Sequence, residues 1–155
     1  MSTRAVLSRL DGESVARWAS AARDALAAAR DEIDELNVYP VPDGDTGTNL
    51  HLTLDAAVEA LAESSLCGGD TETPTPQRLV SALAHGALMG ARGNSGVILA
   101  QLLRGIADGL EGVEGALDGG QLAAALTSGA REAYEAVADP VEGTMLTVAR
   151  VARVS

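Results

Sequence analysis

Lysine is absent from this 155-residue chain, and all 11 basic residues are arginine. The chain therefore has no lysine to act in a P-loop, to form a Schiff base or to serve as a general base. Acidic residues outnumber basic ones by 22 to 11, which gives a formal net charge of −11. Nucleic acids and anionic membranes are therefore not expected partners. If the protein binds a polyanion, metal ions, backbone N–H groups and an arginine must offset the negative charge.

Cysteine, phenylalanine and long apolar segments are also scarce or absent. Cys67 is the single cysteine, so no disulfide can form within the chain, and we expect an inert thiol in a loop of a protein from a reducing compartment. No apolar run approaches the ~18 residues of a membrane helix, and no signal peptide is evident, which predicts a cytoplasmic protein. Without phenylalanine, the core must be built from alanine, leucine and valine.

Apolar residues recur at three- and four-residue spacing, and no strand-like alternation or internal repeat appears. This pattern predicts an all-α fold, with 1–155 forming a single domain. In the first helix we expect Trp18 in the core. The predicted helices cover about 11–36, 48 or 49 to 61, about 77–88, 97–110, about 121–137 and 144–154.

The stretch 37–49, Asn-Val-Tyr-Pro-Val-Pro-Asp-Gly-Asp-Thr-Gly-Thr-Asn, combines stiff backbone with paired carboxylates. Its two prolines fix φ and hold the preceding residues extended, so the segment cannot continue a helix. Gly44 lets the backbone turn, so that Asp43 and Asp45 can converge on one point. Two carboxylates suit Mg²⁺, which keeps its other positions for water and substrate phosphate.

Three polar residues follow the carboxylates and begin the second predicted helix. Thr46, Thr48 and Asn49 offer side chains that cap a helix, and the free N–H groups of a helix N-terminus bind phosphate. An EF-hand loop is excluded because it needs glycine at Thr48 and glutamate at Leu54. A plain Asp-Gly turn before a capped helix remains open as the alternative.

A second informative stretch, Met-Gly-Ala-Arg-Gly-Asn-Ser-Gly at 89–96, ends the third predicted helix. Its three glycines allow a tight backbone with exposed N–H groups, and we expect Asn94 or Ser95 to cap the next helix. A glycine-rich turn that leads into a helix N-terminus can hold phosphate, with Arg92 as a charge partner. A close turn between two helices explains the same glycines and also remains open.

Three segments together resemble the DhaL family, the nucleotide-binding domain of dihydroxyacetone kinases. They are 37–49, Gly-Ala-Arg-Gly-Asn-Ser-Gly-Val-Ile-Leu at 90–99, and Pro-Val-Glu-Gly-Thr-Met-Leu at 140–146. The Pro-Val-Pro and Arg-Gly-Asn-Ser-Gly forms look most like the ATP-binding subunit of bacterial fatty acid kinase, the FakA-like (YloV-type) branch. The resemblance implies a barrel of antiparallel helices whose loops at one end hold a nucleotide and two Mg²⁺ ions.

The resemblance also assigns roles to residues. Asp43 and Asp45 match the carboxylates that bridge Mg²⁺ to phosphate, and they are the expected catalytic residues. Asn37 is the nearest counterpart of a further aspartate in the dihydroxyacetone kinase branch, one residue further away, and is the third expected metal ligand. Thr46 replaces a histidine of that branch. The implied nucleotide contacts are Thr46, Thr48, Asn49, Arg92, Gly93, Asn94, Ser95, Gly96, Thr144 and Met145.

The implied function is that of an ATP- and Mg²⁺-binding domain of a kinase whose acceptor is carried by a separate protein. In the fatty acid kinase branch that partner is a lipid-binding protein; the alternative is a dihydroxyacetone-binding subunit in glycerol metabolism. A nucleotide-binding module or helical remnant without turnover is a further alternative. Family domains usually carry about eight helices, so six helices predict a partial domain whose uncovered faces favour instability or self-association, for example as a homodimer.

Overall fold

The computed structural model describes residues 8–37, 43–66, 73–138, 140 and 145–152. Within these ranges the chain forms helices and no named strand, apart from an isolated antiparallel bridge between Leu10 and Leu117. The predicted all-α fold class is confirmed. The helices are α1 (Gly12–Leu36), α2 (Thr46–Leu66), α3 (Pro76–Gly90), α4 (Gly93–Gly109), α5 (Gly119–Glu135) and α6 (Met145–Ala152).

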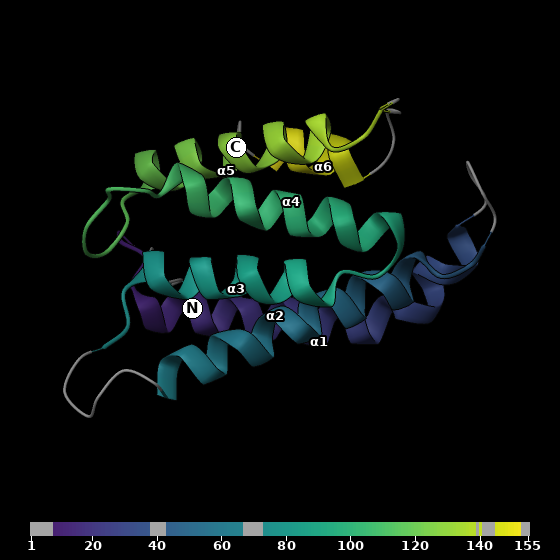
Figure 1. The fold of residues 1–155 in the computed structure, drawn as a ribbon, viewed down its shortest axis with the longest axis horizontal. Coiled ribbons are helices and arrows are strands. Elements are labelled where there is room, and N and C mark those ends of the chain that lie inside the picture. Colours follow the sequence, from purple (N-terminus) through teal and green to yellow (C-terminus); the bar gives the residue numbers. More distant parts are fainter. Residues whose placement is uncertain (1–7, 38–42, 67–72, 139, 141–144, 153–155) are drawn as a thin grey trace, which may run out of the picture.

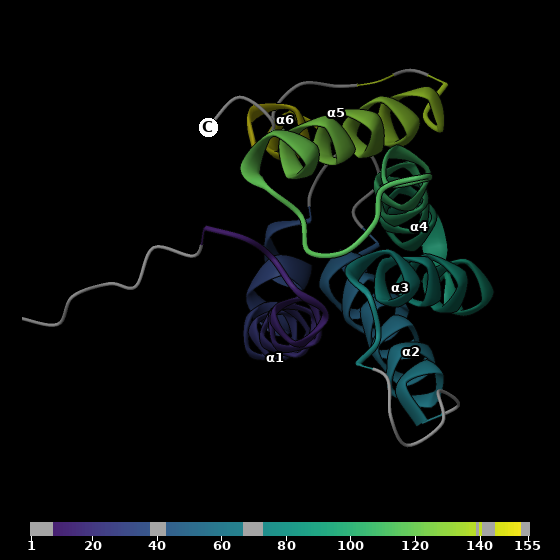
Figure 2. The same cartoon turned by 90° about the vertical axis from the view of Figure 1, so that its left-hand side faces the viewer.

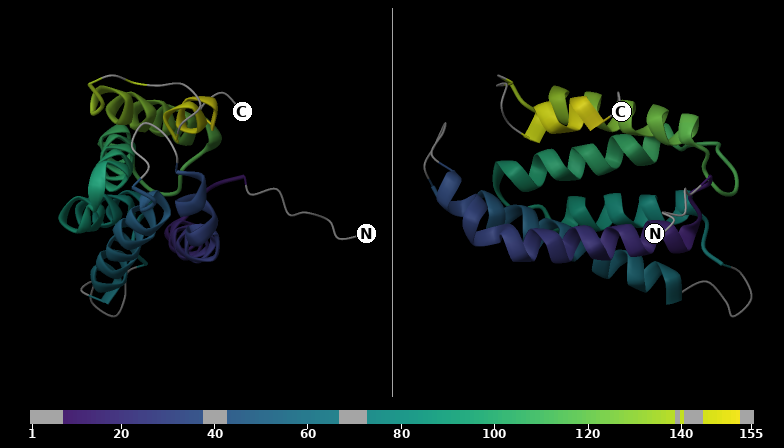
Figure 3. Two further views of the ribbon diagram at one scale, coloured as in Figure 1. Left: turned by 90° about the vertical axis from the view of Figure 1, so that its right-hand side faces the viewer. Right: turned by 180° about the vertical axis from the view of Figure 1, so that it is seen from behind.

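The helices run roughly antiparallel and pack mainly on their neighbours in the chain (Figure 1). Seen along their axes, they follow an arc from α1 through α2, α3, α4 and α5 to α6 (Figure 2). Helices α1, α3 and α5 end, and α2, α4 and α6 begin, at the same end of the bundle. This end lies on the right in Figure 1 and on the left in the right-hand panel of Figure 3. We call it the motif end, because α2 and α4, which the segments 37–49 and 89–96 lead into, both begin there.

The core consists of small and aliphatic side chains, as the composition predicts. Ala57, Ala87 and Ala125 have no exposed surface, and Leu79 and Leu83 are almost completely buried. Alanine at such contacts lets helix backbones approach closely, and the leucines fill the space between the helices. This packing holds α2, α3 and α4 together, and these helices supply most of the predicted site.

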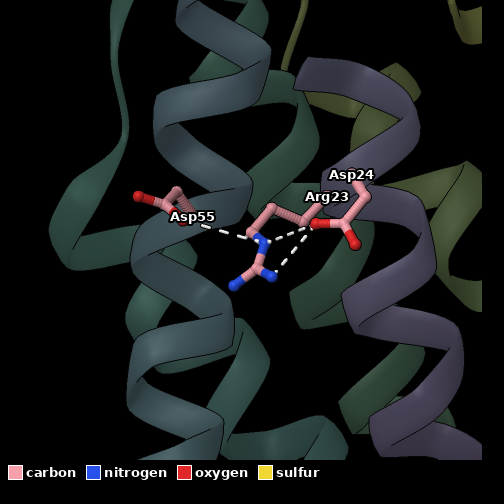
Figure 4. Close-up of polar contacts among 3 residues, drawn as sticks. All are labelled: Arg23, Asp24 and Asp55. Carbon is pink, nitrogen blue, oxygen red and sulfur yellow. Dashed lines mark hydrogen bonds and ion pairs between the residues drawn. The ribbon is translucent and has the colours of Figure 1, made fainter. Parts of the chain in front are cut away.

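Helix α1 packs against α2 and α3, and an arginine near its middle reaches α2. The guanidinium of Arg23 lies 3.0 Å from the Asp24 carboxylate and 4.0 Å from Asp55 of α2, as Figure 4 shows. The prediction that Trp18 belongs to the core is wrong, because 54% of its surface is exposed. In the described part of the chain, α1 packs only against α2 and α3 over an extended contact, so the rest of its apolar stripe, including Trp18, faces outward.

Several helix boundaries differ from the prediction. Helix α2 begins at Thr46 rather than at 48 or 49, and α4 begins at Gly93 rather than at 97. Contacts with neighbouring helices fix both starts, as the site geometry below shows. Cys67 lies outside the described residues. None of the helices in the described ranges has the length and apolar composition that crossing a bilayer would require.

Candidate functional site

The carboxylate turn lies at the motif end, directly before α2. Gly44 has a φ of +65°, a conformation that glycine adopts at little cost, and this confirms the predicted turn between Asp43 and Asp45. Both carboxylates belong to exposed residues. The Asn37 amide donates to Asp43 Oδ1 at 2.5 Å. The structure therefore brings together two of the three predicted metal ligands; the two prolines between them lie outside the described residues.

The start of α2 is capped by a side chain from α1. Thr48 donates its backbone N–H to Asp34 Oδ1 at 3.1 Å and its hydroxyl to Asp34 Oδ2 at 2.6 Å. The hydroxyl bond is the largest reason that the pKa of Asp34 lies below its ordinary value of 3.8. Desolvation opposes this lowering, and the Thr48 and Gly47 amides lower the pKa further. The first turn of α2 thus already holds an anion, which belongs to the protein itself.

This contact explains the early start of α2. The expectation that Thr48 or Asn49 opens the helix is wrong, because Thr46 is its first residue and Asn49 N–H already bonds to the Asp45 carbonyl at 2.8 Å. A cap supplied by Asp34 satisfies N–H groups that would otherwise need a side chain from the preceding loop. Thr46, Thr48 and Asn49 all lie in the first helical turn, beside the carboxylate turn.

The start of α4 differs from that of α2. Its N-cap is Arg92, with φ −121° and ψ 128°, and no side-chain hydrogen bond caps the helix among the described residues. The predicted cap at Asn94 or Ser95 is therefore wrong. The first helical bond runs from Gly96 N–H to the Arg92 carbonyl at 2.9 Å. The N–H groups of Gly93, Asn94 and Ser95 precede that bond, so they carry the positive end of the helix dipole.

The start of α4 packs directly on α2. A Cβ atom placed on Gly93, whose φ is +57°, would lie 2.4 Å from Asn49 Nδ2, and one on Gly96 would lie 2.3 Å from Thr53 Oγ1. A Cβ atom at Gly93 would displace the Asn49 amide, and one at Gly96 would clash with the buried Thr53 hydroxyl. These glycines therefore bring the two motif-bearing helix starts into contact, which places the carboxylate turn and the glycine-rich turn at one location.

Two polar residues of this region were missed from the sequence, Asp34 and Thr53. A signal for Asp34 was present. The last turns of α1 are acidic and its last turn has no basic residue. Because carboxylates are unfavourable at a helix C-terminus, this pattern indicates that a partner elsewhere compensates them. Thr53 has no exposed surface. Its only signal is a hydroxyl within the apolar stripe of α2, which is also typical of ordinary helical threonines.

The donor set around the carboxylate turn fits Mg²⁺. Within the described ranges no three His, Cys, Asp or Glu side chains converge to form a metal cluster, but Mg²⁺ commonly takes only one or two carboxylates and completes its shell with water and phosphate. Asp43 and Asp45 supply two carboxylates, and the Asn37 amide lies within one hydrogen bond of the first. A flip of the Asn37 side-chain amide exchanges its oxygen and nitrogen, so the amide oxygen can take the position beside Asp43.

Other predicted and candidate residues lie further from this contact or outside the description. Met145 is the first residue of α6 and is half-buried at the motif end, whereas Thr144 lies outside the described residues. The Nδ1 atom of His51 is enclosed and has no hydrogen-bond partner in the described part of the chain.

A shallow pocket of about 320 Å³ lies at the opposite end of the bundle. It is formed by the start of α3, the end of α4 and the segment that follows α4, and Asp108 and Glu111 line it together with Gln77 and Ser81. Two carboxylates and no arginine make it a poor place for phosphate.

Comparison with known protein families gives a match to the DAK2 domain over residues 40–154. The chain belongs to the DAK2 family. The match includes the carboxylate turn, the glycine-rich turn and α6, so the resemblance drawn from the three sequence segments is confirmed. The DAK2 domain described here is thus a domain of the dihydroxyacetone kinase family.

Relatives of this DAK2 domain are much longer than the chain. An uncharacterized protein of Staphylococcus saprophyticus is 45% identical over 145 residues, which cover 94% of the chain and 25% of that relative. Protein YloV of Bacillus subtilis is 43% identical over 141 residues, covering 91% of the chain and 24% of YloV. An uncharacterized protein of Staphylococcus aureus is 43% identical over 145 residues. The chain therefore spans about a quarter of the length of these relatives.

Proposed function

We propose that this DAK2 domain binds ATP together with Mg²⁺ at the motif end, as the nucleotide-binding part of a fatty acid kinase-like phosphotransferase. The observation that carries the proposal is the contact of Gly93 with Asn49, which joins a turn bearing two carboxylates to an uncapped helix start. A metal and a phosphate chain require these two kinds of group side by side.

Each group has a distinct role in this proposal. Asp43, Asp45 and the Asn37 amide hold Mg²⁺, which, when bound, supplies positive charge against the phosphate oxygens. The N–H groups at the start of α4 and the Arg92 guanidinium hold the phosphates. This division places positive groups where the ligand is anionic, in a chain whose net charge is −11.

Asp34 has a different role from the other carboxylates. Both of its oxygens accept hydrogen bonds from Thr48, so it maintains the geometry of α2 and is not a metal ligand in this proposal. The hydroxyl hydrogen of Thr48 is used in the same contact, so that oxygen can only accept, which suits Mg²⁺ or a metal-bound water rather than a phosphate oxygen. Thr46 and Asn49 lie beside it, and Thr144 and Met145 are assigned to the nucleotide base by family resemblance.

The domain's contribution to catalysis is positioning and electrostatic stabilisation of the transferred phosphoryl group. We propose that a partner protein carries the acceptor: a lipid-binding protein with a fatty acid, whose carboxylate oxygen attacks the γ-phosphorus and leaves ADP and an acyl phosphate. Dihydroxyacetone on a partner subunit is the alternative acceptor. Because the chain spans about a quarter of its relatives, nucleotide binding is the activity expected of these residues by themselves.

Thermal unfolding of the 155-residue chain with ATP, with Mg²⁺ and with both tests the proposal. A ligand at a hundredfold excess over its Kd stabilises the native state by about 2.7 kcal/mol, or a Tm rise of roughly 5–10 °C. We expect this rise only with both ligands, and its loss in Asp43→Asn/Asp45→Asn. Asp108→Asn/Glu111→Gln removes two charges from the opposite end and should retain the rise. A folded sample without any shift would contradict the proposal.

A further inference from the structure

We infer that Thr53 is a positioning residue for the nucleotide site, because its buried hydroxyl fixes the glycine-rich turn, and with it the start of α4, against α2. The inference rests on the proposed function, since it concerns the placement of the N–H groups that hold phosphate. Thr53 itself contacts no part of the proposed ligand. Its role is to set the position of Arg92 and of the helical turn that follows.

The hydroxyl of Thr53 has one donor and one acceptor contact, and both are made inside the protein. Oγ1 donates to the Asn49 carbonyl at 2.7 Å and accepts from the Arg92 N–H at 3.1 Å. The bond to the carbonyl four residues earlier fixes the side-chain rotamer, so the lone pair that meets Arg92 has a defined direction. Thr53 has no exposed surface, so water does not compete for these contacts.

The Arg92 N–H belongs to the short connection between α3 and α4. Helix α3 ends at Gly90 and α4 begins at Gly93, so this N–H lies outside the hydrogen-bond ladder of either helix. Thr53 is its partner, and the bond ties the N-cap of α4 to the second turn of α2. A Cβ atom placed on Gly96 would lie 2.3 Å from Thr53 Oγ1, which shows how closely the start of α4 approaches α2.

Asn49 and Thr53 are one helical turn apart on α2 and contact successive parts of the α4 start. Asn49 faces Gly93 and Thr53 faces Arg92 and Gly96. A methyl group in place of the hydroxyl would leave the Arg92 N–H without its partner, and the start of α4 would no longer be held at one distance from the carboxylate turn. Ligands that bridge both turns would then bind less tightly.

Substitutions at Thr53 separate positioning from simple filling of the core. Valine keeps the shape of threonine but removes the hydroxyl, whereas serine keeps the hydroxyl but leaves a small cavity. A side chain that only fills space tolerates valine better than serine. A side chain that positions Arg92 through its oxygen shows the opposite order, and this order is the readout that distinguishes the two roles.

The experiment measures Mg²⁺-ATP affinity by calorimetry and hydrogen exchange of the Arg92 amide in the 155-residue chain. We expect Thr53→Val to weaken binding by roughly 3- to 10-fold, the loss expected for one hydrogen bond, and to speed exchange at Arg92. Thr53→Ser should restore both. Thr127→Val is the matched control, because Thr127 makes the same bond to the carbonyl four residues earlier, at 2.8 Å, at an exposed position of α5. It should change neither quantity.

The results separate this inference from the proposed function. Wild-type affinity and unchanged Arg92 exchange in Thr53→Val would overturn the inference while the proposed function stands. Binding of Mg²⁺-ATP by Thr53→Ser that is as weak as that by Thr53→Val would overturn it too. If Thr53→Val does not fold, Thr53→Ser, which retains the hydroxyl, still provides the test against wild type. A wild-type chain that is folded but does not bind Mg²⁺-ATP would refute the proposed function and this inference with it.

Discussion

The starts of α2 and α4 lie against each other at the motif end, yet their N–H groups differ in their hydrogen-bond partners. The first turn of α2 is capped from α1 by Asp34, whose carboxylate accepts from Thr48. The first turn of α4 has Arg92 at its N-cap and no side-chain cap among the described residues. Both helix starts attract anions, but among the described residues a carboxylate occupies only that of α2.

The difference teaches which side of the site suits which part of a ligand. Beside α2, exposed Asp43 and Asp45 add negative charge to a helix start that already holds a carboxylate, and this side suits a cation. Beside α4, free N–H groups and the Arg92 side chain offer positive charge, and this side suits phosphate. The following substitutions break or sharpen this contrast, in order of decreasing expected effect.

Gly96→Ala should break the contact between the two helix starts. The new Cβ would lie 2.3 Å from the buried Thr53 Oγ1, and overpacking of this kind costs about 1–3 kcal/mol. We expect a lower free energy of unfolding in urea and weaker binding of Mg²⁺-ATP. Gly119→Ala is the matched control, since nothing lies within 4 Å of its Cβ position. Equal stability of the two variants would show that the close approach does not exist.

Arg92→Gln should weaken the α4 side without unfolding the protein. Arg92 is exposed, and its backbone N–H contact with Thr53 does not involve the guanidinium. We expect Mg²⁺-ATP affinity to fall about tenfold, which corresponds to ~1.4 kcal/mol, with little change in Tm. Arg104→Gln removes an exposed arginine that pairs with Asp108 on the same helix and serves as the control. Equal affinities of these two variants would argue against phosphate binding beside Arg92.

Asp34→Asn should weaken the α2 side in a pH-dependent manner. The Thr48 hydroxyl holds the pKa of Asp34 below its ordinary value of 3.8, so the carboxylate stabilises the folded state above about pH 3.8. That stabilisation is lost as the pH falls through the lowered pKa. The Tm difference between wild type and Asp34→Asn should therefore be largest near neutral pH and shrink below pH 3.8. Glu35→Gln, an exposed neighbour, is the control; a difference that grows in acid would contradict the assignment.

Arg23→Gln should have the smallest effect, because it tests the attachment of α1 to α2 away from the motif end. The Arg23 side chain is 33% exposed and lies 4.0 Å from Asp55, which is 40% exposed. Such pairs contribute about 0.2–1 kcal/mol and are screened by salt. Urea unfolding at low and high ionic strength should show a loss in this range that disappears at high salt. A larger loss, independent of salt, would mean that Arg23 stabilises α1 by packing.

The fold class and the turn between the two carboxylates could be predicted because they depend on local patterns. Helical spacing of apolar residues gives the helices, and Gly44 with its flanking carboxylates gives the turn. Trp18 was placed wrongly because periodicity identifies an apolar face without showing what covers it. Its 54% exposure depends on how many helices pack around α1, which is a property of the tertiary arrangement.

The helix starts could not be predicted because residues distant in sequence determine them. Asp34 caps α2 from 14 residues earlier, and the Thr53 hydroxyl meets the Arg92 N–H across 39 residues. Local rules assign caps to nearby Ser, Thr, Asp and Asn side chains, so they favour Asn94 or Ser95 and overlook a cap supplied by another helix. The same contacts distinguish the α2 start from the α4 start, which the sequence presents as equivalent.

The most direct test of the account is a two-dimensional NMR titration of backbone amides in the uniformly labelled chain with ADP and Mg²⁺. We expect the largest shifts at Gly93, Asn94 and Ser95, at the start of α4, and small shifts at Gly47 and Thr48, where Asp34 already occupies the N–H groups. Large shifts at Gly47 and Thr48, with Gly93, Asn94 and Ser95 unmoved, would contradict it.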